Sequence, residues 1–147
     1  MRGRTRQEKA WRALAVCLAI GAAGGAAADA VSVSPTRIVA PAGAQDATLT
    51  VKATGSRPAT FQIRVFRWDE RTSPDQLFET REVVASPPIT EIGPNQELTV
   101  RLLRTSNRAA QGHECYRVLV DRLPDSSSGA PQVALRIRHS VPLCFSG

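Results

Sequence analysis

Apolar and polar side chains alternate with a period of two along six segments of the chain, and no long stretch shows the period of an amphipathic helix. Successive side chains of a strand point to opposite faces, so this alternation predicts strands that each bury one face. The alternating segments are residues 31–33, 48–53, 61–65, 98–102, 116–121 and 133–138.

Turn-forming residues separate the predicted strands. They gather at residues 41–43, 55–58, 73–75, 87–88, 93–95 and 125–129. About seven strands at this spacing indicate an all-β fold, a seven-stranded antiparallel immunoglobulin-like β-sandwich. Trp68 and Phe66 break the alternation of their strand. This predicts a bulge or a second packing face, with Trp68 in the core.

The first thirty residues have the composition of an export signal. Five basic residues precede a small, apolar stretch at residues 13–28, which is too short and too rich in Gly and Ala for a stable membrane span. We expect a Sec-type signal peptide over residues 1–30, cleaved after Ala28 or Ala30, and export to the periplasm without stable membrane insertion. Lipidation at Cys17 is disfavoured, because few apolar residues precede that cysteine.

The charge of the chain falls when this leader is removed. The full chain has 19 basic and 13 acidic residues, a net charge of +6. The leader contains five of the bases and two of the acids, which leaves 14 and 11, a net charge of +3. The remaining arginines are spread through the predicted strands and form no basic block, which argues against nucleic acid as a partner.

The mature sequence offers little catalytic chemistry. Its two histidines, His113 and His139, lie far apart, with no carboxylate at a spacing typical of a triad or a metal site. His113 and Cys115 are interpreted as structural, and Asp69 with Glu70 as a solvated acidic turn. No glycine-rich phosphate loop or GxSxG motif is present. We therefore predict a non-enzyme with no catalytic residue, metal or cofactor.

Cys115 and Cys144 form an even pair, which an oxidising compartment would favour as a disulfide. A symmetric hairpin centred near residue 127.5 would instead place residue 115 opposite residue 140, so that Cys144 lies about four residues too far along. Pro142 indicates a break or bulge that could bring the sulfurs together. Bridging is left open, but any link should be intramolecular and structural, because there is no CxxC spacing.

Four motifs in the second half of the chain occur in an informative order. They are SPPI at residues 86–89, GPNQELTVRL at 93–102, ECYRVLVDRLP at 114–124, and the closing segment 133–145. This set resembles the N-terminal domain of PapD-like periplasmic chaperones of chaperone–usher pili, and most closely the archaic, Csu-type branch. The resemblance covers residues 31–145. It implies an ATP-independent chaperone whose partners are pilus subunits and the outer-membrane usher.

The resemblance also implies a donor strand. In this family one strand of the chaperone completes the unfinished fold of a subunit, and its alternating apolar side chains fill the open groove of that subunit. The equivalent residues here are Val133, Leu135 and Ile137. The alternative is an ordinary hairpin strand that covers the core of the domain itself.

A pair of basic residues binds the C-terminal carboxylate of the subunit in the family. Arg37 matches the first of them and has the inward parity of Val31 and Val33. Ser140 stands where the family has its lysine, so we assign the second base to Arg138, with Arg136 as the alternative. An arginine that extends along the rim of a sheet is the competing interpretation of Arg37.

We expect residues 31–147 to form one chaperone domain and the family's second domain to be absent, since the chain ends where the linker should begin. A truncated gene product and a one-domain relative fit equally well. The rival function is a secreted structural or adhesive β-sandwich module without a chaperone role.

Overall fold

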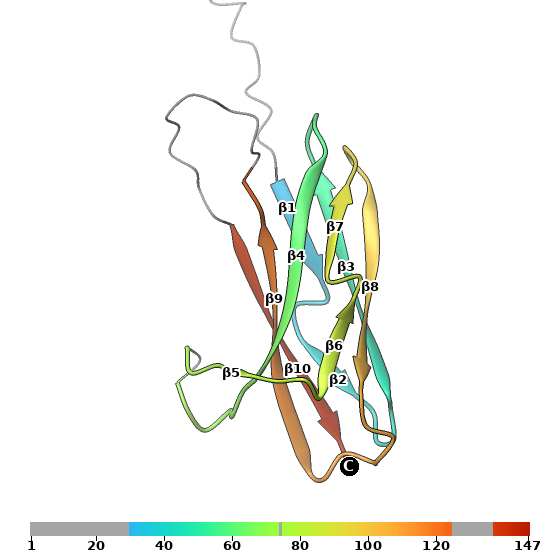
Figure 1. Ribbon diagram of the computed structural model, residues 1–147, viewed down its shortest axis with the longest axis vertical. Coiled ribbons are helices and arrows are strands. Elements are labelled where there is room, and N and C mark those ends of the chain that lie inside the picture. Colours follow the sequence, from blue (N-terminus) through green and yellow to red (C-terminus); the bar gives the residue numbers. More distant parts are fainter. Residues whose placement is uncertain (1–29, 74, 125–136) are drawn as a thin grey trace, which may run out of the picture.

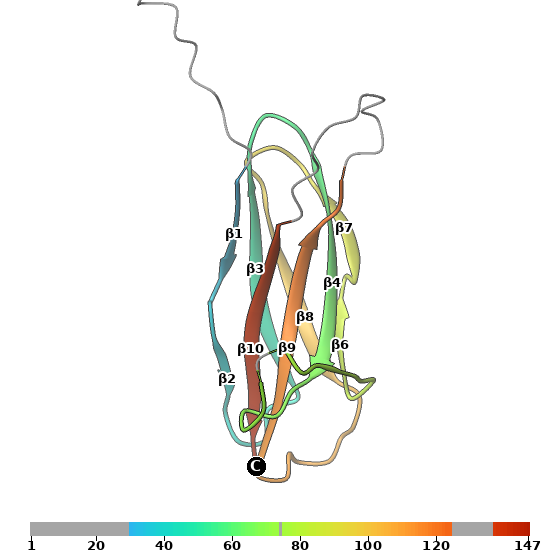
Figure 2. The same cartoon turned by 90° about the vertical axis from the view of Figure 1, so that its left-hand side faces the viewer.

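The computed structural model describes residues 30–73, 75–124 and 137–147. These residues form ten strands and no helix, arranged as two sheets packed face to face (Figures 1 and 2). In the described ranges no helix has the length and hydropathy needed to cross a membrane. The predicted leader at residues 1–30 lies, apart from Ala30, outside the described residues.

The first sheet is fully antiparallel. Its strands, in spatial order, are β1 (Ala30–Ser34), β3 (Asp46–Thr54), β8 (Glu97–Arg104) and β6 (Val83–Ser86).

The second sheet contains the C-terminal strand in its interior. Its strands, in order, are β2 (Ile38–Ala40), β10 (Arg138–Ser146), β9 (His113–Arg122), β4 (Ala59–Arg67) and β5 (Phe78–Glu79), while β7 (Ile89–Ile92) also pairs with β4. β2 runs parallel to β10, and the other pairs are antiparallel. The N-terminal segment therefore changes sheets, from β1 beside β3 to β2 beside β10, along the left edge of Figure 2.

The core lies between the sheets and follows the alternation in the sequence. The largest side chains that are almost fully buried there are Tyr116, Phe61, Phe145, Leu49, Leu102 and Leu143. Burying each such side chain contributes about 1.5–3 kcal/mol. The immunoglobulin-like all-β prediction is confirmed. Five of the six predicted strands are present in the described residues, and the sixth, at 133–138, lies mostly outside them.

Trp68 does not lie in the core, so that part of the prediction is wrong. It follows β4 on the outer side of the second sheet, where it is half-buried. The guanidinium carbon of Arg117 lies 3.9 Å from the centre of the indole ring. Parity explains this position: Phe61, Ile63 and Val65 face the core, so residues 66 and 68 face outward and form the second packing face.

The C-terminal strand differs from its prediction. The expected strand at 133–138 is described only at Ile137, which precedes β10, and at Arg138. Pro142, expected to break a strand, lies inside β10. The N–H of Arg122 donates to the carbonyl of Ile137 (3.2 Å), so odd-numbered residues of β10 occupy the hydrogen-bonded positions of the antiparallel ladder. Pro142 falls at a non-hydrogen-bonded position, where β9 does not need its missing N–H.

Candidate functional site

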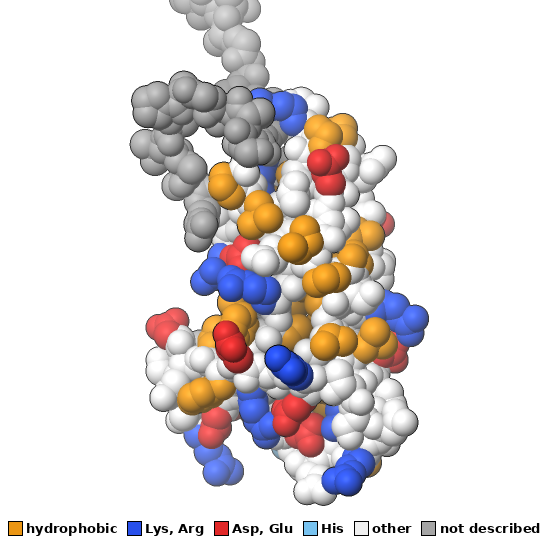
Figure 3. Space-filling model, in the orientation of Figure 1, with side chains coloured by type: hydrophobic (Ala, Val, Ile, Leu, Met, Phe, Trp, Pro, Cys, Tyr) orange, Lys and Arg blue, Asp and Glu red, His pale blue; other side chains and the backbone are white. Residues whose placement is uncertain are grey.

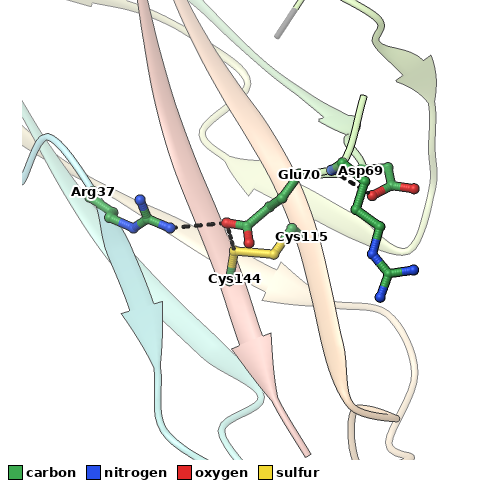
Figure 4. The surroundings of a disulfide bond; sticks show 6 residues. Arg37, Asp69, Glu70, Cys115 and Cys144 are labelled. Carbon is green, nitrogen blue, oxygen red and sulfur yellow. Dashed lines mark hydrogen bonds and ion pairs between the residues drawn. A yellow bond between two sulfur atoms is a disulfide. The ribbon is translucent and has the colours of Figure 1, made fainter. Parts of the chain in front are cut away.

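Arg37 lies in the bend between β1 and β2, where the chain crosses from one sheet to the other. Its side chain is 59% exposed, and Nη2 donates to Oε1 of Glu70 at 2.9 Å (Figure 4). The expected inward orientation is therefore wrong. The bend resets the alternation, and the next residue, Ile38, is buried in place of Arg37.

Cys115 and Cys144 lie directly opposite each other on β9 and β10 and form a disulfide, with Cα atoms 4.2 Å apart. The predicted register, with residue 115 opposite residue 140, is wrong by four residues. Both cysteines are buried beneath the loop that joins β4 to β5. The disulfide ties β9 to β10 near the C-terminal end of β10.

Glu70 belongs to that loop and lies over the disulfide (Figure 4). Its Oε1 atom is 3.5 Å from Sγ of Cys144, a contact and not a hydrogen bond, because a disulfide sulfur carries no hydrogen. Glu70 and the two sulfurs lie within 4.8 Å of one another, as metal ligands do. However, the thiolates that bind metal are consumed in the disulfide. Glu70 therefore acts here as a partner of Arg37.

Arg138 begins β10 and pairs with Asp121 of β9. Its Nε donates to Oδ1 at 2.6 Å, and Arg64 Nη2 donates to Oδ2 of the same carboxylate at 2.7 Å. Burial opposes ionisation of Asp121, but the hydrogen bonds from Arg138 and Arg64 outweigh it and hold its pKa below the ordinary value. The same hydrogen bond raises the pKa of Arg138.

The two predicted anchor residues do not come together. Ile38 pairs with Leu143 in parallel register, which places Arg37 beside Pro142, four residues along β10 from Arg138. At about 3.3 Å per residue, this separates the Arg37 and Arg138 positions by roughly 13 Å along the strand. Ser140 lies between them and is exposed. Arg136, the alternative second base, lies outside the described residues.

The predicted donor residues are only partly described. Ile137 is 37% exposed and precedes β10 directly, whereas Val133 and Leu135 lie outside the described residues. The donor strand therefore stays a prediction.

The face drawn in Figure 3 carries exposed hydrophobic side chains, which are scattered over β4, β6 and β7. A groove of about 610 Å³ there is lined by residues that include Phe66, Val84 and Pro88. Among the residues that the structure describes, none of the predicted site residues lines this groove. It gives no support to the predicted binding site.

Comparison with known proteins identifies the family. The family model "Pili and flagellar-assembly chaperone, PapD N-terminal domain" matches residues 30–146. The chain belongs to this family. A search of curated protein sequences finds no match.

Solved structures agree with this PapD-type assignment. The archaic Csu chaperone CsuC of Acinetobacter baumannii, in its pre-assembly complex with the tip adhesion subunit CsuE, matches with a TM-score of 0.67 and 27% identity over 80% of this chain and 57% of that chain. The Salmonella enterica SafB chaperone, in complex with the SafA pilin, has 23% identity and a TM-score of 0.64 over 80% and 54% of the two chains. The E. coli chaperone DraB has 22% identity and a TM-score of 0.62 over 80% and 55%. The chain thus spans a little over half the length of these chaperones.

Two parts of this PapD-type domain escaped sequence reasoning. Glu70 was interpreted as part of a solvated turn. It pairs with Arg37 from 33 positions away, and no local sequence pattern indicates a contact between residues so far apart. The Arg64–Asp121–Arg138 cluster joins three strands, and a correct β9–β10 register would have revealed its Asp121–Arg138 half.

We predict that Asp121→Asn lowers the free energy of unfolding by about 1–2 kcal/mol at pH 7, because it removes the anion shared by two half-exposed arginines. The pKa of Asp121 is depressed in the folded state, so this stabilisation is present above the unfolded pKa near 4 and is lost as pH falls through the lower folded value. Urea unfolding across this pH range should show the two proteins converging in acid.

The matched control is Asp46→Asn, which breaks a more exposed pair with Arg101. It should change stability less at every pH. A difference between Asp121→Asn and the wild type that persists undiminished into acid would contradict the assignment.

Proposed function

We propose that the chain is a periplasmic chaperone that binds pilus subunits and keeps them folded by donor-strand complementation, without ATP and without catalysis. The observation that carries the proposal is Arg37, a half-exposed cation beside β10 in a domain of the PapD family. An arginine in this position can bind a terminal carboxylate through two parallel hydrogen bonds.

Strand donation would supply most of the binding free energy. The segment at 133–137 leads directly into β10, so a subunit anchored at Arg37 would lie along the same side of the second sheet. Main-chain hydrogen bonds would provide affinity, and Val133, Leu135 and Ile137 would fill the groove of the subunit. Apolar burial needs no nucleotide.

The proposed partners follow from this role. The tip adhesion subunit and the pilin in the CsuC and SafB complexes are the kind of ligand we propose for this chain. The outer-membrane usher would receive the complex, and the leader would deliver the chain to the periplasm. Arg138 is a weaker candidate for the anchor than Arg37, because its partner Asp121 is only 14% exposed and is also bound by Arg64, whereas Glu70, the partner of Arg37, is 45% exposed.

We predict that Arg37→Ala weakens subunit binding about 10- to 150-fold, since a charge-assisted contact to a carboxylate contributes about 1.5–3 kcal/mol. Stability should change by less than about 1 kcal/mol, because the pair that is lost is exposed. The measurement is the ratio of subunit to chaperone recovered from periplasm after co-expression with candidate subunits of an archaic pilus system, at matched ionic strength.

Arg101→Ala is the control for this variant. Arg101 is 62% exposed and pairs with Asp46 at 2.7 Å, much as Arg37 pairs with Glu70, but it lies on the first sheet. It should bind subunits as the wild type does. Equal recovery with Arg37→Ala would remove Arg37 from the site. If no subunit is recovered with any variant, a structural or adhesive module becomes the better account.

A further inference from the structure

The guanidinium group that we assign to the subunit carboxylate already holds a carboxylate in the free chain. Arg37 Nη2 donates to Glu70 Oε1 at 2.9 Å, and the two side chains are 59% and 45% exposed. Figure 4 shows Glu70 extending from the loop between β4 and β5 across the disulfide toward Arg37. This contact joins residues 33 positions apart.

We propose that Glu70 occupies the place of the subunit's terminal carboxylate, so that an incoming subunit must displace it from Arg37. The inference rests on the proposed function. Two carboxylates that share one guanidinium repel each other, and each lowers the affinity of Arg37 for the other. Glu70 would thus weaken binding of the subunit terminus and ease its later release.

The ion pair between Arg37 and Glu70 can be displaced by another carboxylate. Ion pairs between exposed side chains are weak, and water can replace either partner. The backbone of the loop is held independently, because the N–H of Trp68 donates to the carbonyl of Cys115 (3.0 Å) and the N–H of Arg71 donates to the carboxylate of Asp69 (2.9 Å). The Glu70 side chain can therefore turn into solvent while the loop keeps its place.

The surroundings of Glu70 near the disulfide indicate that Glu70 competes with a subunit carboxylate for Arg37 and does not hold Arg37 in position. Besides Arg37, the Glu70 carboxylate contacts the Cys144 sulfur at 3.5 Å, and this sulfur donates no hydrogen bond because it belongs to the disulfide. Among the described residues, no hydrogen bond besides the one from Arg37 holds the Glu70 carboxylate in place, so it is not fixed firmly enough to orient Arg37.

The test uses the whole purified chain and a simple carboxylate, N-acetylglycine, with N-acetylglycinamide as its neutral counterpart. Binding is followed by the NMR shifts of the backbone amides of residues 37–40, which Arg37→Ala also has. Glu70→Gln should bind N-acetylglycine roughly two- to fivefold more tightly than the wild type, and the advantage should shrink at high salt. The amide should bind neither protein, and Arg37→Ala should lose the response.

Asp46→Asn is the matched control, because it frees Arg101 from an ion pair of similar exposure on the other sheet. It should leave the affinity at Arg37 unchanged. Equal affinity of Glu70→Gln and the wild type, or no binding to either, would overturn the inference. Weaker binding by Glu70→Gln would also overturn it, since Glu70 would then position Arg37 instead of competing for it.

Co-expression with pilus subunits separates this inference from the proposed function. If Glu70→Gln binds N-acetylglycine more tightly but no variant recovers a subunit, the competition stands and the chaperone function fails. If subunits are recovered while Glu70→Gln matches the wild type in both assays, the function stands and the competition fails. Higher recovery of subunit with Glu70→Gln supports both.

Discussion

Replacing both Cys115 and Cys144 with Ala is expected to lower the free energy of unfolding by about 3–4 kcal/mol. The disulfide links residues 29 positions apart, and closing a loop of this length removes a corresponding amount of chain entropy from the unfolded state. Both cysteines are also buried, so the substitution removes packed sulfur atoms. Urea unfolding of the oxidised wild type and the double variant measures the difference.

The wild type under reducing conditions is the control for this experiment. It should unfold near the midpoint of the double variant, because both lack the link between β9 and β10. Equal midpoints for the oxidised wild type and the double variant would contradict a structural role. A covalent dimer in non-reducing mass spectrometry would contradict an intramolecular one.

The fold was largely predictable because alternation reports burial. Leu49, Val100 and Val118 are fully buried and stand at the inward positions of their predicted strands. The parallel β2–β10 pair was missed, since a strand of three residues carries too short a pattern. Within the described residues the two sheets contain ten strand segments, compared with about seven expected, because short pieces such as β5 and β7 interrupt longer connections.

The register of β9 with β10 shows the limit of such patterns. A slip of one residue would reverse the faces of a strand, but a slip of four leaves every inward residue inward. Period-two alternation therefore could not choose between residue 140 and residue 144 as the partner of Cys115. The same error hid the pairing of Asp121 with Arg138, which lie opposite each other.

The candidate site was less predictable than the fold. Arg37 was identified through a family resemblance, but its exposure was misjudged because the alternation was counted across the bend before β2. Its contact with Glu70 depends on how a long loop folds over the second sheet. No local sequence signal encodes that placement.

Leu135→Asp is expected to abolish subunit capture while the free domain stays folded. In the proposed complex, the side chain at 135 would lie in the apolar groove of the subunit, where an unpaired carboxylate costs several kcal/mol. A loss of about 4 kcal/mol corresponds to roughly 1000-fold in affinity. Recovery of the subunit and the thermal unfolding of the free chain are measured together.

Two further variants bracket this prediction. Val84→Asp places the same charge on an apolar strand residue that is 43% exposed, in β6 of the first sheet. It should keep both the fold and the subunit. Val141→Asp places the charge in the core, where the side chain is 3% exposed, and should unfold the domain. Together they distinguish a lost interface from a lost fold.

Co-purification of subunits with tagged wild type and tagged Leu135→Asp from periplasm tests the central claim most directly. The account predicts that the wild type retains a pilus subunit and that the folded Leu135→Asp variant retains none. Equal retention by the two folded proteins, or unfolding of Leu135→Asp in a chain that never captures a subunit, would contradict strand donation.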